Sequence, residues 1–447
     1  MLTLQYMKKW LLISLLPAMF CMNSCKNSTA NSPEDFTVTR LRSVGEASPN
    51  PFNLAHCLLP GSKETLESFR HVSKGRLYYM DYDIDFPFED FIAGEENERL
   101  APDDYPSLMN RFNSALYDDA VKGNMSSGSA CACSGFVCHN AEGQLLFGRN
   151  MDSRCGNLIV SFHRKQSDGY KFVFMTNKYY LDLLNGEAGP EYDATGVFID
   201  GKTDLSLALR QPLFALDGMN EHGLCFAAYQ LPDFMPDKAL ENPNMPMPVD
   251  QNTPGGKGQI TYSTLVYLIL SKCRTVSEVE EMMAGYDYVT MMNKLNTHWY
   301  VADAEGDYAV FEYWGRGTGD SPFKLYVMRH KERFRKTANS TYYGVPYEYN
   351  SIENYYCNPE AAFTYNQDRW QFFFSNKVRA HHMMSAYKPT MSEREALLCL
   401  QEGSYGIEEP DDVTNWSCVY NPAERTMLFN MHNDMSEVYS IDLKEDL

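Results

Sequence analysis

The sequence predicts an α+β fold in which antiparallel sheets are layered with helices on their outer faces. Strand-like segments come in pairs joined by short turns near both ends of residues 133–441, and the helical segments are grouped between them. Strands joined by tight turns pair antiparallel. Helices that are grouped together, rather than alternating with strands, pack outside such sheets.

Apolar runs separated by Asn, Asp and Gly mark the hairpins. The expected strands cover residues 135–138, 144–148, 158–164, 171–176, 212–216, 223–230, 298–301, 308–313, 324–328, 416–420, 426–429 and 438–441. Helical spacing of apolar residues predicts helices over 262–272, directly after Thr275, over 368–380 and over 392–401. Thr275 and Ser392 each precede a Glu by three residues, which is the spacing of a capping box.

Residues 36–132 are expected to form a separate layer ahead of this fold. Helical patterns cover 62–73 and 106–122, and a strand-like pattern covers 77–86. The small residues 123–130 then form a flexible linker directly before Cys131. Residues 231–256 contain six prolines, so a substrate-flanking lid and a disordered insert are both compatible with that stretch.

The first 25 residues have the composition of an export signal. A short basic region at residues 7–9 precedes an apolar run over 10–20, which is too short to span a bilayer. Cys25 follows a small serine, as the lipidated cysteine of a bacterial lipoprotein signal does, and the polar residues 26–35 would be a tether. An ordinary cleaved signal peptide is the alternative. The lipoprotein reading predicts an exported protein, anchored to a bacterial envelope membrane through lipid alone.

Composition restricts the class of partner. The chain of 447 residues carries 39 basic and 59 acidic side chains, a net charge of −20, without a basic cluster for nucleic acid. Ten of the twelve cysteines lie beyond the signal, and those in apolar runs, such as Cys225 and Cys399, are expected to be buried free thiols. Oligomeric state stays open.

The stretch from Cys131 to Cys155 brings reactive side chains together. Cys133 lies at the start of one expected strand, and Arg149 and Asp152 lie just past the next, 16 and 19 residues later. A hairpin joins these ends, so a thiol, a guanidinium and a carboxylate share one small volume. If Cys133 were an N-terminus, its α-amine, with a pKa of about 8, would be a general base already in place. Arg149 would favour the thiolate and Asp152 would orient the amine.

This spacing resembles the N-terminal-nucleophile amide hydrolases of the choloylglycine hydrolase type, in which Cys is followed by Arg and Asp in a Phe-Gly-Arg-Asn-Met-Asp context. Here residues 147–152 carry that context, residues 217–224 resemble the family's Gly-Met-Asn-Glu-x-Gly-Leu hairpin, and His298-Trp299 resembles another motif. The resemblance covers roughly residues 133–441. It implies a four-layer αββα sandwich and hydrolysis of a linear amide through an acyl-thioester on Cys133, without a cofactor or metal.

Further site residues follow from the same resemblance. Asn339 matches the oxyanion asparagine, Arg369 matches a later arginine that braces the site, and Gln230 stands where bile salt hydrolases carry Asn. Gln230 therefore leaves the acyl and amine groups of the N-acyl amide substrate open. The long segment ahead of Cys133 resembles that of acid ceramidase, which implies self-cleavage between Ala132 and Cys133. Residues 36–132 would then be a pro-segment and a partner of the domain 133–447.

Several simpler interpretations compete with this one. The cysteines at 131, 133, 138 and 155 lack the paired spacing of a zinc knuckle. Cys131 as nucleophile would put Arg149 and Asp152 two residues out of spacing, and those two side chains alone would form an ordinary salt bridge. Arg369 is nearly as compatible with a structural pair, and His222 and His298 are expected in a turn and in the core. A rival from another class is a non-catalytic, aromatic-rich lipoprotein that only binds ligands.

Overall fold

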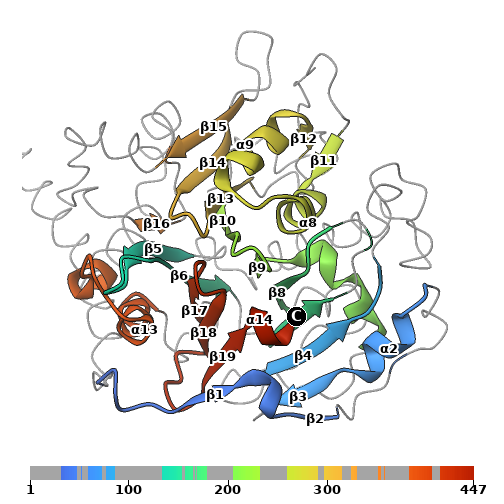
Figure 1. Cartoon of the computed structure of the whole chain (residues 1–447), viewed down its shortest axis with the longest axis horizontal. Coiled ribbons are helices and arrows are strands. Elements are labelled where there is room, and N and C mark those ends of the chain that lie inside the picture. The colour runs from blue at the N-terminus through green and yellow to red at the C-terminus, as the bar shows by residue number, and fades with distance from the viewer. Residues whose placement is uncertain are drawn as a thin grey trace, which may run out of the picture.

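The structure is a computed structural model of the chain. It describes residues 32–47, 52, 59–72, 77–85, 133–153, 157–164, 167, 169–178, 205–231, 259–289, 296–314, 324–329, 351–353, 357, 382–404 and 413–447. Their strands form two large sheets and one small pair (Figure 1). The expected helices at 106–122 and 368–380, and nearly all of the proline-rich stretch 231–256, lie outside these residues.

The first large sheet has seven strands. Their order is β1 (Val38–Arg40), β19 (Val438–Asp442), β18 (Thr426–Met431), β17 (Val413–Asn421), β6 (Leu145–Ser153), β5 (Ser134–His139) and β16 (Ser351–Glu353). All neighbours pair antiparallel except β1 with β19. The strands expected in the first and last hairpins are therefore confirmed. Strand β6 is longer than expected, so Arg149 and Asp152 lie within it rather than past its end.

The second large sheet has ten strands. Their order is β15 (Lys324–Arg329), β14 (Tyr308–Trp314), β13 (Asn296–Ala302), β10 (Cys225–Leu231), β9 (Asp217–Asn220), β8 (Phe172–Asn177), β7 (Leu158–His163), β4 (Leu77–Tyr82), β3 (Arg70–Val72) and β2 (Glu46–Ala47). A short parallel pair, β11 (Gln259–Thr261) with β12 (Asp287–Val289), stands apart. The strands expected at 158–164, 171–176, 223–230, 298–301, 308–313 and 324–328 are confirmed.

The strand expected at 212–216 is wrong. The 3-10 helix η6 (Leu205–Phe214) occupies that stretch, and the strand β9 begins only at Asp217. Pro212 has no N–H to donate to a sheet ladder, so the apolar run around it cannot complete a central strand. This shift of the strand places Asp217 inside the ten-stranded sheet.

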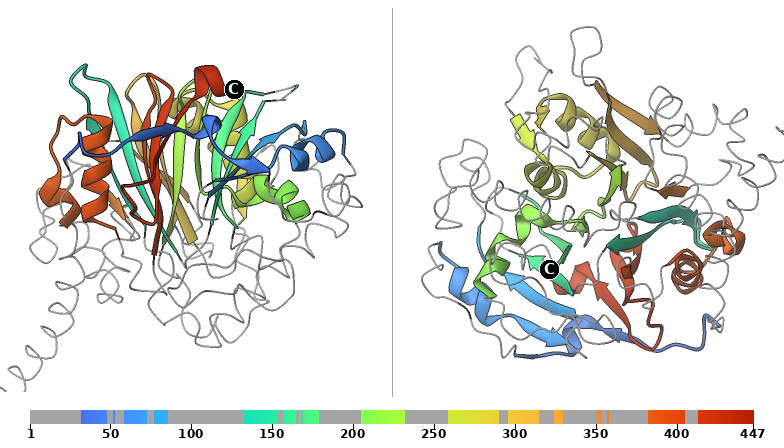
Figure 2. Two further views of the ribbon diagram at one scale, coloured as in Figure 1. Left: turned by 90° about the horizontal axis from the view of Figure 1, so that it is seen from below. Right: turned by 180° about the vertical axis from the view of Figure 1, so that it is seen from behind.

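Helices cover the outer faces of both sheets, which gives four layers. Helices α8 (Tyr262–Lys272) and α9 (Val276–Ala284) pack with α2 (Ser62–Glu67) against the ten-stranded sheet, and α13 (Glu393–Glu402) packs on the seven-stranded one. Side chains from the facing surfaces of both sheets form the central apolar layer. Figure 2 shows α13 on one outer side and the sheets within. The α+β fold and its αββα layering are confirmed.

The expected helix caps have different partners. The Ser392 hydroxyl accepts from the Glu395 N–H while the Glu395 carboxylate accepts from the Ser392 N–H, a complete capping box. The Thr275 hydroxyl accepts from the Glu278 N–H, but the Glu278 carboxylate accepts from the N–H one residue earlier, at Arg274. Both helices therefore begin where the sequence predicts.

The segment before Cys133 is not a separate layer. Strand β1 extends the seven-stranded sheet, and β2, β3 and β4 extend the ten-stranded one, with β4 parallel to β7. Tyr78 and Met80 of β4 pack in the outer apolar cluster while Leu77 and Tyr79 pack in the central one. A strand with apolar side chains on both faces must be covered on both, and an inner position in a sandwich provides that cover.

No helix among the described residues is long and apolar enough to cross a membrane. The signal expected at 1–25 and residues 26–31 of the tether expected at 26–35 lie outside the described part of the chain. Their assignment stays a prediction.

Candidate active site

Cys133 lies directly before β5, in the apolar layer between the two sheets. Its side chain is 2% exposed and packs in the central cluster, whereas Cys138, within β5, packs in the outer cluster under α13. Because these two thiols face opposite sides of β5, they do not meet in one metal cluster. Cys131 and Cys155 lie outside the described residues.

Arg149 is fully buried on β6 and contacts the candidate nucleophile. Its side chain is hydrogen-bonded to Cys133, and Nη2 donates to the Ala228 carbonyl at 2.9 Å. Nη1 donates to the carbonyl of the next residue, Asn150. The strand β6 therefore places a permanent cation beside the thiol, held by carbonyls of both sheets.

The charge of Arg149 is balanced by Asp217, which the sequence reasoning did not select. The Arg149 Nε lies 2.7 Å from the Asp217 Oδ2, and both side chains are fully buried. The Trp416 indole N–H donates to the same oxygen at 3.0 Å. Burial raises the pKa of Asp217 to about 6, although Arg149 and Trp416 oppose that rise. This network connects β6 and β17 of one sheet with β9 of the other.

Asp152 lies three residues beyond Arg149 on β6 and is also fully buried. Its Oδ1 accepts a hydrogen bond from the Thr414 hydroxyl of β17. The register of β6 against β17 shifts between Thr414 and Trp416, next to this contact. Such irregularities redirect side chains locally, so the bulge positions both Thr414 on Asp152 and Trp416 on Asp217.

Tyr229 on β10 fits tightly against the start of β5. Its ring lies 5.1 Å from the Arg149 guanidinium carbon, a cation–π distance. A Cβ added at Gly135 would lie 2.3 Å from the Tyr229 hydroxyl oxygen and 2.6 Å from the Gly148 carbonyl oxygen. Only glycine therefore fits at 135, two residues after Cys133, where the two sheets approach each other.

The remaining predicted site residues are only partly placed. Gln230 lies on β10 opposite Thr297, and the structure describes its backbone alone. Asn339, Arg369 and Ala132 lie outside the described residues, as does Cys25.

The other residues discussed from the sequence lie where it indicated. His222 is half-buried in the β9–β10 turn, and His298 is buried. Cys225 and Cys399 are buried and not in disulfides, and burial raises the pKa of both thiols.

The site residues missed from the sequence are Asp217, Tyr229, Thr414 and Trp416. Asp217 is the first residue of the motif at 217–224, so the sequence marks its position. It does not show that its partner is Arg149, which lies on the other sheet. Trp416 and Thr414 come from β17, more than 260 residues beyond Arg149 and Asp152. Contacts between segments so far apart in the chain carry no spacing signal.

Comparison with known proteins gives one family match. Residues 133–319 match the linear amide C-N hydrolases, choloylglycine hydrolase family, and the matched region begins at Cys133. No curated protein matches the chain in sequence.

Solved structures also match. A mutant of conjugated bile acid hydrolase from Clostridium perfringens is 16% identical, with a TM-score of 0.41, over 70% of this chain and 93% of that one. Penicillin V acylase from Agrobacterium tumefaciens is 18% identical, with a TM-score of 0.40, over 70% of this chain and 87% of that one.

Proposed function

We propose that this chain, whose residues 133–319 belong to the choloylglycine hydrolase family of linear amide C-N hydrolases, cleaves its substrate amide with the Cys133 thiol as nucleophile. The observation that carries the proposal is the buried contact between Cys133 and Arg149. A cation held beside a thiol favours the thiolate, which is the nucleophilic form. The match to the family begins at this cysteine.

Activation is self-cleavage between Ala132 and Cys133. The Cys133 Sγ attacks the Ala132 carbonyl carbon, the C–N bond between the two residues breaks, and the nitrogen takes the thiol proton. Water then hydrolyses the thioester, which leaves a carboxylate on Ala132 and frees both the thiol and the α-amine of Cys133. The amine, with a reference pKa of about 8, is the general base for later turnovers.

Each turnover uses the same groups. The Cys133 amine takes the thiol proton as sulfur attacks the substrate carbonyl, and returns it to the departing nitrogen. Asp152 orients the amine, Arg149 stabilises the thiolate, and Asp217 holds Arg149 in place. Asn339, which matches the family's oxyanion asparagine, donates a hydrogen bond to the negatively charged oxygen of the tetrahedral intermediate. Water then hydrolyses the acyl-thioester and releases the acid.

The experiment for this proposal is a panel of N-acyl amides, comprising bile-salt-like conjugates, N-acyl amino acids, N-acyl amines and penicillin V, assayed for release of the free amine. Rapid quenching of a turning-over sample should also trap an acyl group on Cys133. Gln230 in place of Asn favours substrates other than bile salts, because its longer side chain puts the amide N–H elsewhere. Absence of amine release from every class would refute the proposal.

After cleavage, residues 36–132 remain bound as a second chain. Strand β4 pairs with β7 over six residues, and Tyr82 of β4 stacks on the buried His163 of β7 with ring centroids 4.2 Å apart. The Tyr82 hydroxyl donates to the Leu209 carbonyl at 2.8 Å. None of these contacts depends on the peptide bond at 132–133.

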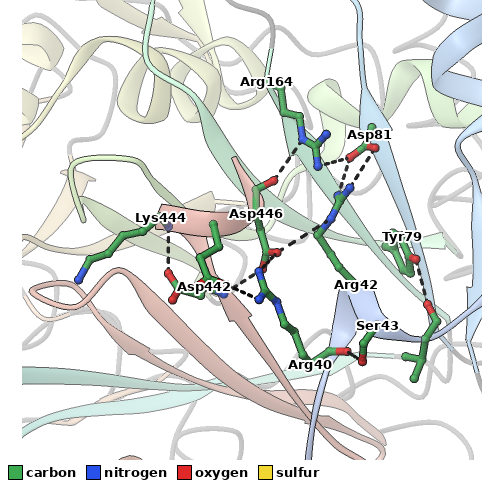
Figure 3. A network of polar contacts seen from close by, with 11 residues as sticks. Arg40, Arg42, Ser43, Tyr79, Asp81, Arg164, Asp442, Lys444 and Asp446 are labelled. Carbon is green, nitrogen blue, oxygen red and sulfur yellow. Dashed lines mark hydrogen bonds and ion pairs between the residues drawn. The ribbon is translucent and has the colours of Figure 1, made fainter.

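An ion-pair network also connects the segment before Cys133 to the rest of the protein (Figure 3). Asp81 of β4 lies 2.6 Å from Arg42 of the upstream segment and 3.2 Å from Arg164, which follows β7. Arg40 lies 2.6 Å from Asp446 of α14 (Leu443–Asp446), a carboxylate with a 2% exposed side chain. The network connects the upstream segment to both β7 and the C-terminal helix. Its arginines are partly exposed, so its strength falls with salt.

We expect both cleaved chains to co-elute in size-exclusion chromatography, in low salt and in 1 M salt alike, because buried strand pairing outlasts screened ion pairs. Separation should require denaturant. The uncleaved Cys133→Ala chain serves as the size standard. Elution of the catalytic chain alone in native buffer would contradict retention of the pro-segment.

We further propose that residues 1–25 are an export signal of the lipoprotein type. Cys25 would carry the lipid that holds the enzyme at a bacterial envelope membrane, with residues 26–35 as tether. Metabolic labelling with a fatty acid tests this, since wild-type protein should be labelled and a Cys25→Ala variant should not.

A further inference from the structure

We propose that His298, Glu312 and Cys357 form a zinc-binding site between the two sheets, separate from the groups that perform the amide chemistry. Their ligand atoms, an imidazole nitrogen, a carboxylate oxygen and a thiol sulfur, all lie within 4.8 Å of one another. The proposal rests on this cluster alone and does not depend on the proposed function.

Two of the three residues come from neighbouring strands, and the third lies beyond the end of another strand. His298 on β13 and Glu312 on β14 are directly opposite each other in the antiparallel register, and both are fully buried. The His298 Nδ1 lies 2.8 Å from the Glu312 Oε1. Cys357 lies four residues beyond β16 of the seven-stranded sheet, and its backbone N–H donates to the same Glu312 oxygen at 2.7 Å. The site therefore joins two strands of the ten-stranded sheet to the chain beyond β16.

The donor set suits zinc rather than magnesium or calcium. Zinc binds imidazole, thiolate and carboxylate together at about 2.0–2.3 Å, whereas the harder cations prefer oxygen alone. A thiolate and a carboxylate together neutralise the charge of a divalent cation, which lowers the cost of burying it. Binding releases the thiol proton of Cys357 to solvent, and the proton between the His298 Nδ1 and Glu312 moves to the His298 Nε2, which leaves Nδ1 free to bind the metal.

The partial exposure of Cys357 gives a metal ion access to the site from the side of that residue. Cys357 is only half-buried, whereas the two other ligands are enclosed. A metal can therefore reach Cys357 first and then the inner pair. Three protein ligands leave one of zinc's four tetrahedral positions for water or another ligand.

The site borders the candidate active site through one aromatic ring. Tyr229 packs edge-on against His298, with ring centroids 5.7 Å apart, and the Arg149 guanidinium carbon lies over the same ring, 5.1 Å from its centroid. Strand β16 pairs with β5, which begins one residue after Cys133. Zinc held by Cys357 would thus fasten the edge strand beside the nucleophile to the facing sheet. The expected effect is a stabilised fold rather than a step in the reaction.

The test is titration of the purified full-length, metal-free protein with Zn²⁺, and with Co²⁺ as a spectroscopic substitute. We expect one Zn²⁺ per chain, a higher melting temperature on binding, and a sulfur-to-cobalt charge-transfer band. Cys357→Ser should lose the band and bind Zn²⁺ at least about tenfold more weakly. Glu312→Gln, which keeps the size of the side chain, should also weaken binding while the band remains.

Cys273→Ser is the matched control, because that thiol packs on the outer face of the ten-stranded sheet. It should leave affinity and spectrum unchanged, and melting curves in chelator should show that every variant folds. The proposal is overturned if wild-type protein binds no Zn²⁺ at one equivalent. It is equally overturned if Cys357→Ser retains both the affinity and the charge-transfer band, since another of the thiols would then be the ligand.

Discussion

Replacing Cys133 by alanine is expected to abolish both self-cleavage and turnover. Without the thiol there is no nucleophile for the Ala132 carbonyl or for a substrate amide. Loss of a nucleophile in comparable hydrolases lowers kcat by about 10⁴-fold or more. Intact-mass analysis should find one chain that is not cut after Ala132, and amine release should fall to the uncatalysed rate.

Cys138→Ala is the matched control for this change. Cys138 lies within β5, is also buried, and faces α13 instead of Arg149. It should cleave itself and turn over like the wild type, with a small loss of stability from the cavity. If Cys133→Ala retained cleavage, another thiol such as Cys131 would be the nucleophile.

The second large effect is expected at the buried ion pair. Asp217→Asn removes the carboxylate 2.7 Å from Arg149 and leaves that cation buried beside a neutral partner. Breaking a buried pair in this way costs about 3–5 kcal/mol of unfolding free energy. Urea denaturation of the uncleaved Cys133→Ala background measures it without interference from cleavage.

A double-mutant cycle measures the coupling free energy between Arg149 and Asp217, apart from the contacts that each residue makes with its other neighbours. Arg149→Met combined with Asp217→Asn should be more stable than the sum of the single losses predicts, by about 2 kcal/mol. The control pair is Arg329 with Glu280, 2.6 Å apart and partly exposed. Its coupling should be below about 1 kcal/mol. Equal coupling for both pairs would mean that burial does not strengthen the Arg149 contact.

The pH dependence of activity tests whether Asp217 positions Arg149 for the reaction or only stabilises the fold. Burial raises the pKa of Asp217 to about 6, so below that pH it gains a proton and no longer balances Arg149. Activity should therefore fall on the acid side, and Asp217→Asn should lack this limb.

The local sequence pattern was sufficient to predict most of the strands in the sandwich. Alternating apolar runs and turn residues predicted the hairpins because adjacent strands are paired by short loops that the sequence displays directly. The Cys133–Arg149 contact was also predictable, since both residues belong to one hairpin.

Contacts between distant segments were not predictable in this way. Asp217 approaches Arg149 only because two sheets face each other, and its strand was displaced in the prediction by the run around Pro212. The upstream strands were read as a separate layer because nothing in residues 77–82 indicates that their neighbour is β7, beyond the cleavage junction. Such pairings depend on tertiary packing and not on local sequence.

The central claim is that Cys133 becomes an N-terminus and acts as the nucleophile. N-terminal sequencing and intact-mass analysis of active wild-type enzyme test it together in one sample. We predict two chains, of which the larger begins with Cys133, and we expect the fraction of cleaved protein to rise in proportion to the measured activity. A fully active preparation in which Cys133 is still joined to Ala132 would contradict the account.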